Sequence, residues 1–212
     1  MESFIRTDQY QFIKSQTQIL INGYASVNDK KVLNALKSLV YDKVINLFND
    51  INVEQKQLIE PIIEVTDSVK AEEYLLTLKP FVIPFKKVTE QIVKKLFPKA
   101  KKLKQPSLEQ IDLKELTYFG WNDKGSNKKF VIALLENEFI GLHGSFTPSS
   151  KKGVCTICNR HAEVGLFMSE TKGTAQGTYI SRGNYICQDS MKCSENIKSL
   201  KKLNEFIELL KS

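Results

Sequence analysis

The sequence predicts an α+β fold, with a helical bundle over residues 1–97 and an antiparallel-sheet domain over residues 98–212. Apolar residues recur at steps of three and four in the first part, as on one face of a helix. Short β-type runs separated by turn compositions fill the second part. All four cysteines also lie in the last third of the chain. The two parts are therefore expected to have different architectures.

The first part opens with two amphipathic helices. Apolar side chains between residues 32 and 48 form one stripe, and Asn28 or Asp29 is a suitable N-cap for that helix. Before it, Thr7 or Asp8 can cap a helix with an apolar face of its own. Such helices are too short to be stable alone, so they must pack on one another.

Prolines punctuate the rest of the first part. Pro61 lacks an N–H donor and predicts a kink or break in the third helical segment. A fourth helix is expected over residues 68–78, and a fifth over Val88–Leu96, where Pro98 ends it. These helices complete the predicted bundle, with their apolar residues in its core.

A lysine-rich stretch, residues 99–106 (KAKKLKQP), separates the two parts. It is interpreted as a solvated linker, with a basic RNA contact as the alternative. Beyond it an antiparallel sheet is predicted, and its strands are expected over residues 117–121, 129–135, 138–143, 164–168, 178–180 and 185–186. The last two flank Ser181–Asn184, whose composition predicts a hairpin turn. A final helix is expected over residues 200–210.

The composition is that of an ordinary soluble globular protein, with 42% hydrophobic and 26% charged residues. The formal net charge of +7 is shared unequally between the two parts. Residues 1–97 carry 13 basic and 12 acidic side chains, whereas residues 98–212 carry 18 and 12. This modest excess favours an acidic or nucleic-acid partner for the second part, and a plain solvated surface is the alternative.

The cysteines have the spacing of a metal site. Cys155 and Cys158 are two residues apart, and Cys187 and Cys193 form a second pair further along the chain. Two thiolates at this spacing can bind one ion from a tight turn, and a second pair can complete a tetrahedron. With four thiolate ligands no open position remains for a catalytic water, so the prediction is one structural Zn²⁺. Two disulfides or four unrelated core thiols are the alternatives.

The disulfide alternative requires an oxidising compartment. The segment Met1–Asp8 contains no apolar core of a signal peptide, and no apolar run approaches the roughly 18 residues of a membrane span. We therefore expect a cytoplasmic, reduced monomer without a membrane segment. Paired cysteines in that setting more often bind metal than form disulfides.

The predicted elements around the cysteines are those of a treble-clef zinc finger. The first pair lies in a knuckle between strands, and Cys187 ends a hairpin strand. Asp189 or Ser190 can then cap a short helical turn that presents Cys193. Because binding of zinc to such small modules is coupled to folding, the ion should contribute strongly to the stability of this domain.

Catalytic motifs are scarce. The two histidines, His143 and His161, fall in different predicted elements. His161 lies just past the knuckle and is a candidate substitute ligand, whereas His143 is interpreted as an ordinary strand residue. The sequence contains no glycine-rich phosphate loop and no nucleophile elbow. We therefore expect a protein without enzymatic activity.

The chain resembles the FusB-type fusidic acid resistance proteins, which are also described as elongation factor G-binding proteins. The resemblance runs from the helical part to the last helix. Its most specific segments are Phe119–Asn122 (FGWN), Cys155–Asn159 (CTICN), Leu166–Met168 (LFM) and Gly183–Ser190 (GNYICQDS), the last followed by Cys193.

The resemblance implies a function that spacing alone cannot show. Members of this family bind elongation factor G through the C-terminal zinc domain, here residues 98–212. They promote release of the factor from the ribosome on which fusidic acid has trapped it, and they do not alter the drug. The resemblance therefore implies target protection, a form of antibiotic resistance without a chemical step.

The resemblance also implies a partner-binding surface, which maps onto Val154, Arg182, Tyr185 and Phe206. Arg182, Tyr185 and Phe206 keep the chemistry of the family, while Val154 replaces an aromatic residue and offers less contact area. A core position on the last helix is the alternative for Phe206.

A ribosome- or RNA-binding zinc protein with a housekeeping role in translation is the second hypothesis. This hypothesis is supported by the basic excess of the second part. It is also supported by three aromatic residues close in sequence to two lysines, namely Tyr118, Phe119 and Trp121 near Lys128 and Lys129. Aromatic side chains interleaved with basic ones can stack bases and bind phosphates. Packing of these aromatics within the sheet explains them equally well.

Overall fold

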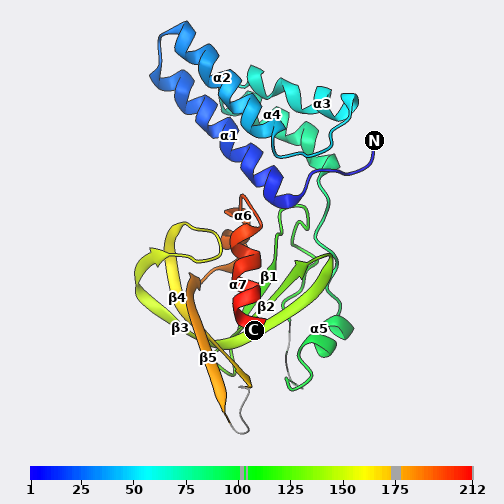
Figure 1. Cartoon of the computed structure of the whole chain (residues 1–212), viewed down its shortest axis with the longest axis vertical. Helices are drawn as coiled ribbons and strands as arrows, with labels where there is room; N and C mark the ends of the chain where they lie inside the picture. Colours follow the sequence, from blue (N-terminus) through cyan, green and yellow to red (C-terminus); the bar gives the residue numbers. More distant parts are fainter. Residues whose placement is uncertain (101–102, 104, 173–177, 212) are drawn as a thin grey trace. The chain divides into compact units, whose positions relative to one another are not determined.

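The computed structural model describes the chain except residues 101–102, 104, 173–177 and 212, and except the side chain of residue 172. The described residues divide into two compact units, Met1–Ile83 and Pro84–Ser212 (Figure 1). The first unit is helical and the second is built on one antiparallel sheet. The predicted α+β class is therefore confirmed.

The first unit is a bundle whose helices begin at polar caps. Its elements are α1 (Thr7–Ser26), α2 (Lys30–Ile45), α3 (Val53–Ile59), η1 (Glu60–Glu64), α4 (Ser68–Leu78) and η2 (Lys79–Phe81). The side chains of Asp29, Asn52 and Asp67 accept hydrogen bonds from backbone N–H groups in the first turns of α2, α3 and α4. Pro61 lies where α3 passes into the 3-10 helix η1, so the predicted break is confirmed.

The second unit consists of a sheet with three helices. Its elements are α5 (Glu90–Leu96), β1 (Phe119–Asp123), β2 (Lys128–Leu135), β3 (Glu138–Val154), β4 (His161–Lys172), β5 (Tyr179–Cys187), α6 (Ser190–Glu195) and α7 (Lys201–Lys211). The strands follow one another in the order β1-β2-β3-β4-β5, and all pairs are antiparallel. The sheet is therefore a meander, as predicted, with β1 and β5 at its edges.

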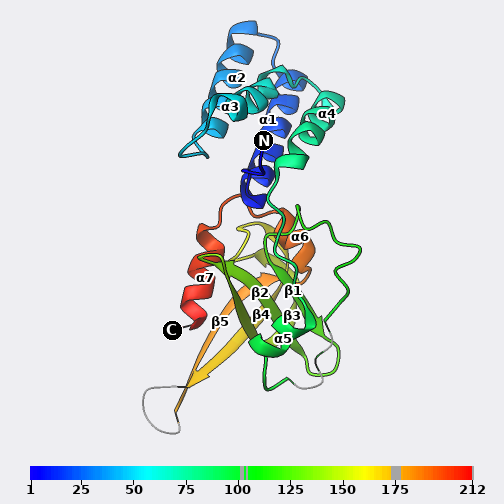
Figure 2. The ribbon, with the colours of Figure 1, turned by 90° about the vertical axis from the view of Figure 1, so that its right-hand side faces the viewer.

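Each face of this sheet has its own core. On one face, Val131, Leu142 and Phe167 pack with the apolar side of α7 and with the four cysteines. On the other face, Trp121 and Phe130 pack with residues in and around α5. The two helices on either side of the strands can be followed in Figure 2. The metal-ligating residues thus belong to one of two cores that share a sheet.

The unit boundary differs from the predicted one. The division falls between residues 83 and 84, not between 97 and 98, because α5 packs on the sheet. The ring of Phe97 lies 5.0 Å from that of Phe130 and 6.2 Å from that of Trp121. Helical periodicity identified α5 but could not show which core receives its apolar side. The described residues of the predicted linker, such as Leu103, pack against the same cluster, while residues 101, 102 and 104 lie outside the described residues.

The predicted hairpin turn at residues 181–184 is wrong. These residues lie inside strand β5, which pairs with β4 along its whole length. Gly183 has a packing reason for its presence: a Cβ atom there would lie 2.0 Å from Sδ of Met168 on the neighbouring strand. Gly183 therefore allows a close approach of the Met168 side chain from the neighbouring strand, rather than forming a turn.

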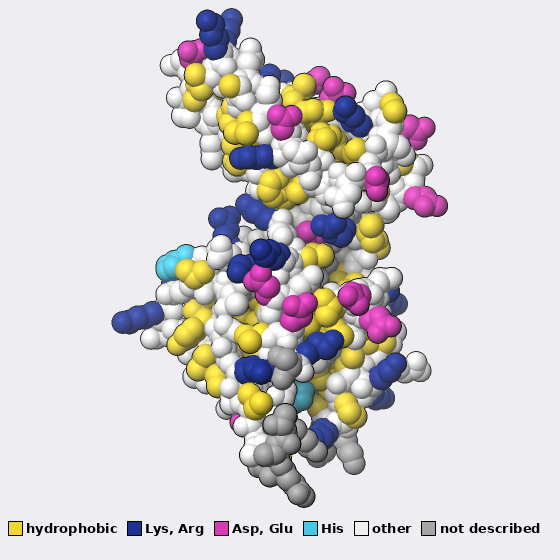
Figure 3. Space-filling view, viewed as in Figure 1, with side chains coloured by type: hydrophobic (Ala, Val, Ile, Leu, Met, Phe, Trp, Pro, Cys, Tyr) yellow, Lys and Arg dark blue, Asp and Glu magenta, His cyan; other side chains and the backbone are white. Residues whose placement is uncertain are grey.

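The difference in net charge between the two parts is larger when the chain is divided at residue 83 than at residue 97. Residues 84–212 hold 22 lysines and arginines against 13 acids, whereas residues 1–83 hold 9 against 11. On the face drawn in Figure 3, lysine and arginine side chains of the second unit are scattered among acids and apolar patches. No helix among the described residues is long and apolar enough to cross a membrane.

Candidate metal centre and the adjoining surface

The first cysteine pair lies in the tight loop that joins β3 to β4. The backbone N–H of Cys155 donates to the carbonyl oxygen of Arg160, and that of Asn159 donates to the carbonyl oxygen of Cys155, both at 2.9 Å. Asn159 has a φ of 54°, in the left-handed region that asparagine tolerates better than most residues. The loop is therefore the predicted knuckle, and it holds Cys155 and Cys158 on its inner side.

The second pair comes from the end of β5 and from α6. Cys187 is the last residue of the strand, and Asp189 follows as the N-cap of the helix. The Asp189 carboxylate accepts hydrogen bonds from the N–H groups of Met191 and Lys192, at 2.9 and 3.1 Å. This cap fixes the first turn of α6, from which Cys193 projects into the core.

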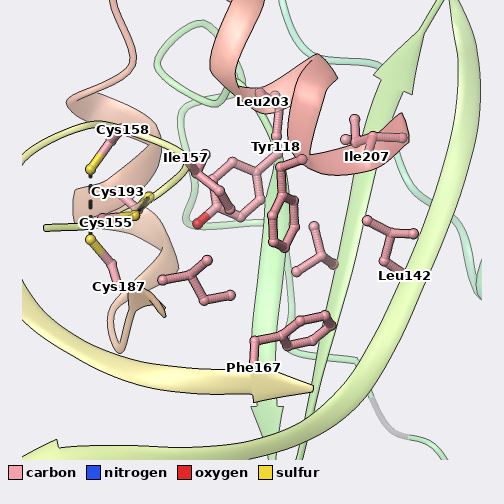
Figure 4. Close-up of a cluster of buried hydrophobic side chains, with 14 of the residues drawn as sticks. Tyr118, Leu142, Cys155, Ile157, Cys158, Phe167, Cys187, Cys193, Leu203 and Ile207 are labelled. Carbon is pink, nitrogen blue, oxygen red and sulfur yellow. Dashed lines mark hydrogen bonds between the residues drawn. The ribbon is translucent and has the colours of Figure 1, made fainter. Parts of the chain in front are cut away.

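The four sulfurs are arranged for one tetrahedral ion. They all lie within 4.8 Å of one another, and the Cys155–Cys193 and Cys158–Cys187 sulfur pairs are each 3.7 Å apart (Figure 4). A tetrahedron with Zn–S bonds of about 2.3 Å has edges of about 3.8 Å. All four residues are free cysteines and buried, so the disulfide alternative is not the arrangement found.

Without a cation, four sulfurs at this distance could not all be thiolates. Hydrogen bonding with Cys155 and Cys158 raises the pKa of the Cys187 and Cys193 thiols, and burial adds to the effect. A bound dication removes this conflict because it stabilises every ligand in its deprotonated form. The donor set, four buried sulfurs without an oxygen ligand, suits zinc.

Two buried hydroxyls beside the cluster fit the same conclusion. Tyr118 Oη and Ser190 Oγ have no hydrogen-bond partner among the described residues. Figure 4 shows the oxygen of Tyr118 directed toward the cysteine sulfurs. Burial raises the pKa of Tyr118, and the negative charge of the nearby Cys193 adds to the effect, so this hydroxyl keeps its proton. A buried tyrosine hydroxyl directed at sulfur indicates that the sulfur is an acceptor in the native state, as a metal-bound thiolate is.

Sequence reasoning missed Lys129, a fully buried lysine near the metal centre. Its side chain is 0% exposed, and its Nζ donates to the carbonyl oxygen of Gln188, the residue after the ligand Cys187, at 2.8 Å. Burial lowers the pKa of Lys129 to about 8, although the nearby Cys193 and Cys187 sulfurs oppose the shift. Its alternation with neighbouring apolar residues on a strand was the available signal, because it places the lysine on an inward position.

Two of the predicted partner-binding residues are exposed, each within two residues of one of the four cysteines. Val154 is 58% exposed and Tyr185 is 51% exposed. Val154 is the last residue of β3, directly before the knuckle, and the knuckle is attached to β5 by a hydrogen bond from the Thr156 N–H to the Tyr185 carbonyl oxygen. Tyr185 also lies opposite Leu166 of β4. The structure thus gathers an exposed apolar and aromatic patch next to the metal centre.

Arg182 has a different setting from the one predicted. It lies within β5 rather than at a turn tip, and its side chain is half-buried. Its Nη1 donates to the carbonyl oxygen of Leu209 in α7 at 3.0 Å. The guanidinium therefore contacts the C-terminal helix.

Phe206 is not a surface residue in this structure. Its side chain is 1% exposed, and its ring lies 5.9 Å from that of Phe167 in the core beneath α7. The apolar stripe of α7 points toward the sheet, and Phe206 is part of that stripe. Its burial therefore supports the core alternative for Phe206.

The histidines stand apart from the metal cluster. His143 is exposed on β3, where its ring lies 5.9 Å from that of Phe97 and 5.8 Å from that of Phe130. His161 is exposed and pairs with Val154. Among the described residues, the group that gathers metal-ligating atoms consists of the four cysteines.

Comparisons with known proteins support a zinc finger in the second unit. A family model described as elongation factor G-binding protein, N-terminal, matches residues 4–86, and one described as FBP C-terminal treble-clef zinc-finger matches residues 90–208. The chain is similar to a solved structure of the fusidic acid resistance protein FusC. The two are 33% identical, with a TM-score of 0.84, over 98% of each chain. Curated protein sequences gave no match.

The matched zinc-finger model identifies the four-cysteine cluster as a treble-clef centre that binds one Zn²⁺. Its four thiolate ligands leave no coordination position for substrate, so the ion stabilises the fold rather than supplying chemistry. The two family models also meet between residues 86 and 90, close to the structural boundary.

Proposed function

Because the chain belongs to the elongation factor G-binding protein family, we propose that it binds elongation factor G through its zinc-bearing unit. Binding promotes release of the factor from a ribosome stalled by fusidic acid. The outcome is resistance by target protection, in the cytoplasm, with no chemical step. The similarity to the fusidic acid resistance protein FusC over nearly the whole chain supports this direction.

The exposed patch beside the zinc knuckle is the observation that carries the proposal. Tyrosine is among the residues that dominate interface energies, and a side chain of this kind that is half exposed on an edge strand is available to a partner. Tyr185 is such a residue, and Val154 extends the patch toward the knuckle. Phe206 is left out of the proposed contact because it is buried.

The zinc acts here as a positioning element. Cys155 directly follows Val154, and Cys187 lies two residues after Tyr185. A single ion therefore joins the two chain segments that carry the patch. A rigid, preorganised surface loses less conformational entropy on binding than a mobile one.

The basic character of the second unit also supports binding to elongation factor G at the ribosome. Its 22 lysines and arginines against 13 acids favour approach to acidic protein surfaces and to a ribosome rich in phosphate. Arg182 contributes one of these charges at the side of the sheet that α7 covers. Electrostatic attraction of this kind mainly raises the association rate.

Direct RNA binding is the second candidate, favoured only by this charge. The stacking platform considered for it is absent from the surface, because Tyr118, Phe119 and Trp121 are 0%, 1% and 7% exposed. The basic side chains that remain for such a contact would bind phosphates. Such contacts weaken steeply with salt and show little sequence preference.

Calorimetric titration of purified elongation factor G with the full chain and its variants tests the proposal. Tyr185→Ala should weaken binding by about 2 kcal/mol, the scale of an interface anchor. Tyr179→Ala is the matched control, since Tyr179 is 68% exposed on the same strand but far from the knuckle. Equal losses in both variants, or none in either, would refute a contact centred on Tyr185.

A fragment of residues 84–212 distinguishes the units. It should retain measurable binding to elongation factor G, whereas residues 1–83 alone should not bind. A parallel titration with ribosomal RNA at two salt concentrations examines the alternative. Tight, salt-sensitive RNA binding without binding to the factor would favour the RNA hypothesis.

A further inference from the structure

The buried ammonium of Lys129 has no carboxylate partner among the described ion pairs. Its Nζ donates to two carbonyl oxygens, Gln188 O at 2.8 Å and Asn122 Oδ1 at 3.2 Å, and lies 4.7 Å from the centre of the Phe146 ring. These contacts are dipolar. An ammonium that is taken fully out of water needs an opposite charge as well.

That opposite charge is supplied by the metal centre. Four thiolates and one Zn²⁺ carry a net double negative charge in a core with little access to water. The Lys129 ammonium is hydrogen-bonded to the carbonyl oxygen of Gln188, the residue between the ligand Cys187 and the capping residue Asp189. The carboxylate of Asp189, which caps α6, adds its own negative charge on the same side of Lys129.

Two buried hydroxyls lie beside this centre, that of Tyr118 toward the sulfurs and that of Ser190 beside the Tyr118 ring. Tyr118 Oη and Ser190 Oγ are buried without a partner, and the charge of Cys193 acts on the Tyr118 hydroxyl. Gly120 makes room for this arrangement. A Cβ atom on it would lie 2.7 Å from Ser190 Oγ and 3.0 Å from the Tyr118 ring.

We propose that Lys129, Tyr118 and Ser190 form an outer shell that compensates the negative charge of the zinc–thiolate centre and makes the Cys193 thiolate a weaker nucleophile. Lys129 acts as the counter-charge. The Tyr118 hydroxyl acts as an O–H donor toward Cys193 Sγ, and the Ser190 hydroxyl, which lies beside the Tyr118 ring at Gly120, holds that ring in place. These are positioning and electrostatic roles, and none of the three residues is a zinc ligand.

The proposal follows from the charges. A thiolate that accepts hydrogen bonds and faces a cation holds its lone pairs more tightly, so it donates less readily to an electrophile. Removing the outer shell leaves the same ligands and the same ion. It should therefore change the reactivity and the spectrum of the centre more than its zinc stoichiometry. The inference depends on the zinc centre and is independent of the proposed binding to elongation factor G.

The experiment compares zinc-loaded full-length protein with the variants Tyr118→Phe, Ser190→Ala and Lys129→Gln. Lys128→Gln is the matched control for charge, because Lys128 is the exposed neighbour on the same strand. Tyr74→Phe is the matched control for loss of a buried hydroxyl, because Tyr74 lies in the first unit. Two readouts are used: the rate of zinc release on alkylation by iodoacetamide, and the sulfur-to-cobalt charge-transfer band after substitution with Co²⁺.

We expect Tyr118→Phe and Lys129→Gln to release zinc faster and to shift the charge-transfer band to lower energy, with both controls unchanged. Competition with a chelator should show zinc affinity lower by about tenfold or more in Lys129→Gln, the usual scale for outer-shell substitutions. A merely structural role would change the melting temperature but leave the band in place.

Wild-type rates and band positions in folded, zinc-loaded Tyr118→Phe and Ser190→Ala would overturn the role of the hydroxyls. For Lys129, a variant that fails to fold is replaced by a measurement on the unmodified protein. Nitrogen NMR of the lysine side chains should show the Lys129 Nζ as an ammonium at neutral pH in the zinc-loaded form. A neutral amine there would overturn the counter-charge.

Discussion

The backbone N–H of Thr156 donates a 2.9 Å hydrogen bond to the carbonyl oxygen of Tyr185, which attaches the zinc knuckle to the outer edge of the sheet. Thr156 Oγ1 adds a second contact, to Asn184 Oδ1 at 3.3 Å. Edge strands expose unpaired backbone groups, and here the knuckle covers part of that edge. The knuckle of the metal centre and the strand that carries Tyr185 are therefore held in a fixed arrangement.

Cys158→Ser should abolish zinc binding and unfold the second unit. A site with three thiolates leaves buried charge uncompensated, and zinc binding is coupled to folding in such modules. The first unit should keep its helices, because its apolar cluster is separate from those of the sheet. Metal analysis together with circular dichroism of the full chain measures both effects.

His161→Ala is the control for that experiment. His161 is exposed beside the knuckle, and it should leave one zinc per chain with an unchanged melting temperature. Loss of zinc in His161→Ala, or a stable metal-free second unit in Cys158→Ser, would contradict the four-cysteine centre.

Val154→Phe should strengthen binding to elongation factor G without harming the fold. Val154 is 58% exposed, so a larger ring meets solvent rather than a packed core, and stability should change by no more than about 0.5 kcal/mol. The ring adds aromatic contact area next to Tyr185. Calorimetric titration against the factor measures the gain, with Val53→Phe as control, since Val53 is 72% exposed in the first unit. An unchanged affinity would place Val154 outside the interface.

Phe206→Ala should destabilise the second unit by about 3–5 kcal/mol, because it removes a buried ring from the core beneath α7. Any loss of binding should then follow the loss of folded protein. Leu209→Ala is the matched variant on the same helix, since Leu209 is 44% exposed, and its effect on stability should stay within about 0.5 kcal/mol. Chemical denaturation of both variants checks this. A fully stable Phe206→Ala that nevertheless fails to bind the factor would restore Phe206 as a contact.

The features that were predicted correctly from the sequence depend on residues close together in the chain. The helix predicted over residues 68–78 has those bounds in the structure, because Asp67 caps its start. The metal ligands were recognisable because the spacing of Cys155 and Cys158 reflects the geometry of a turn around an ion. Both features depend on a few neighbouring residues.

Features that depend on distant neighbours escaped sequence reasoning. Gly183 resembles a turn residue unless the Met168 side chain across the strand is known. The apolar side of the last helix could face either a partner or the sheet, so the burial of Phe206 stayed open. Lys129 alternates with inward apolar residues, but the acceptors that its ammonium needs lie far away in the sequence, as Gln188 does. The two compact units divide at residue 83 rather than 97 for the same reason, because α5 has an apolar side but no local mark of the core that receives it.

The N-cap of α4 predicts a pH dependence confined to the first unit. Asp67 Oδ1 accepts hydrogen bonds from the N–H groups of Val69 at 2.9 Å and Lys70 at 3.1 Å. The bond from the Lys70 backbone, with one from the Thr66 hydroxyl, lowers the pKa of Asp67 below its ordinary value. Because the folded-state pKa is the lower one, the ionised cap stabilises the folded state above the unfolded-state pKa. This contribution is lost as the pH falls through the folded-state pKa.

Asp67→Asn keeps a side-chain acceptor but cannot ionise, so it isolates the charge. Wild type should melt at a higher temperature than Asp67→Asn at pH 7. This difference in melting temperature should shrink as the pH falls below the ordinary pKa of an aspartate carboxyl group. Asp67→Ala removes the acceptor as well and should be the least stable of the three at neutral pH. Thermal melting followed by helical circular dichroism of residues 1–83 across this pH range provides the measurement. A difference between wild type and Asp67→Asn that stays constant down to strongly acidic pH would show that the carboxylate charge contributes nothing to the cap.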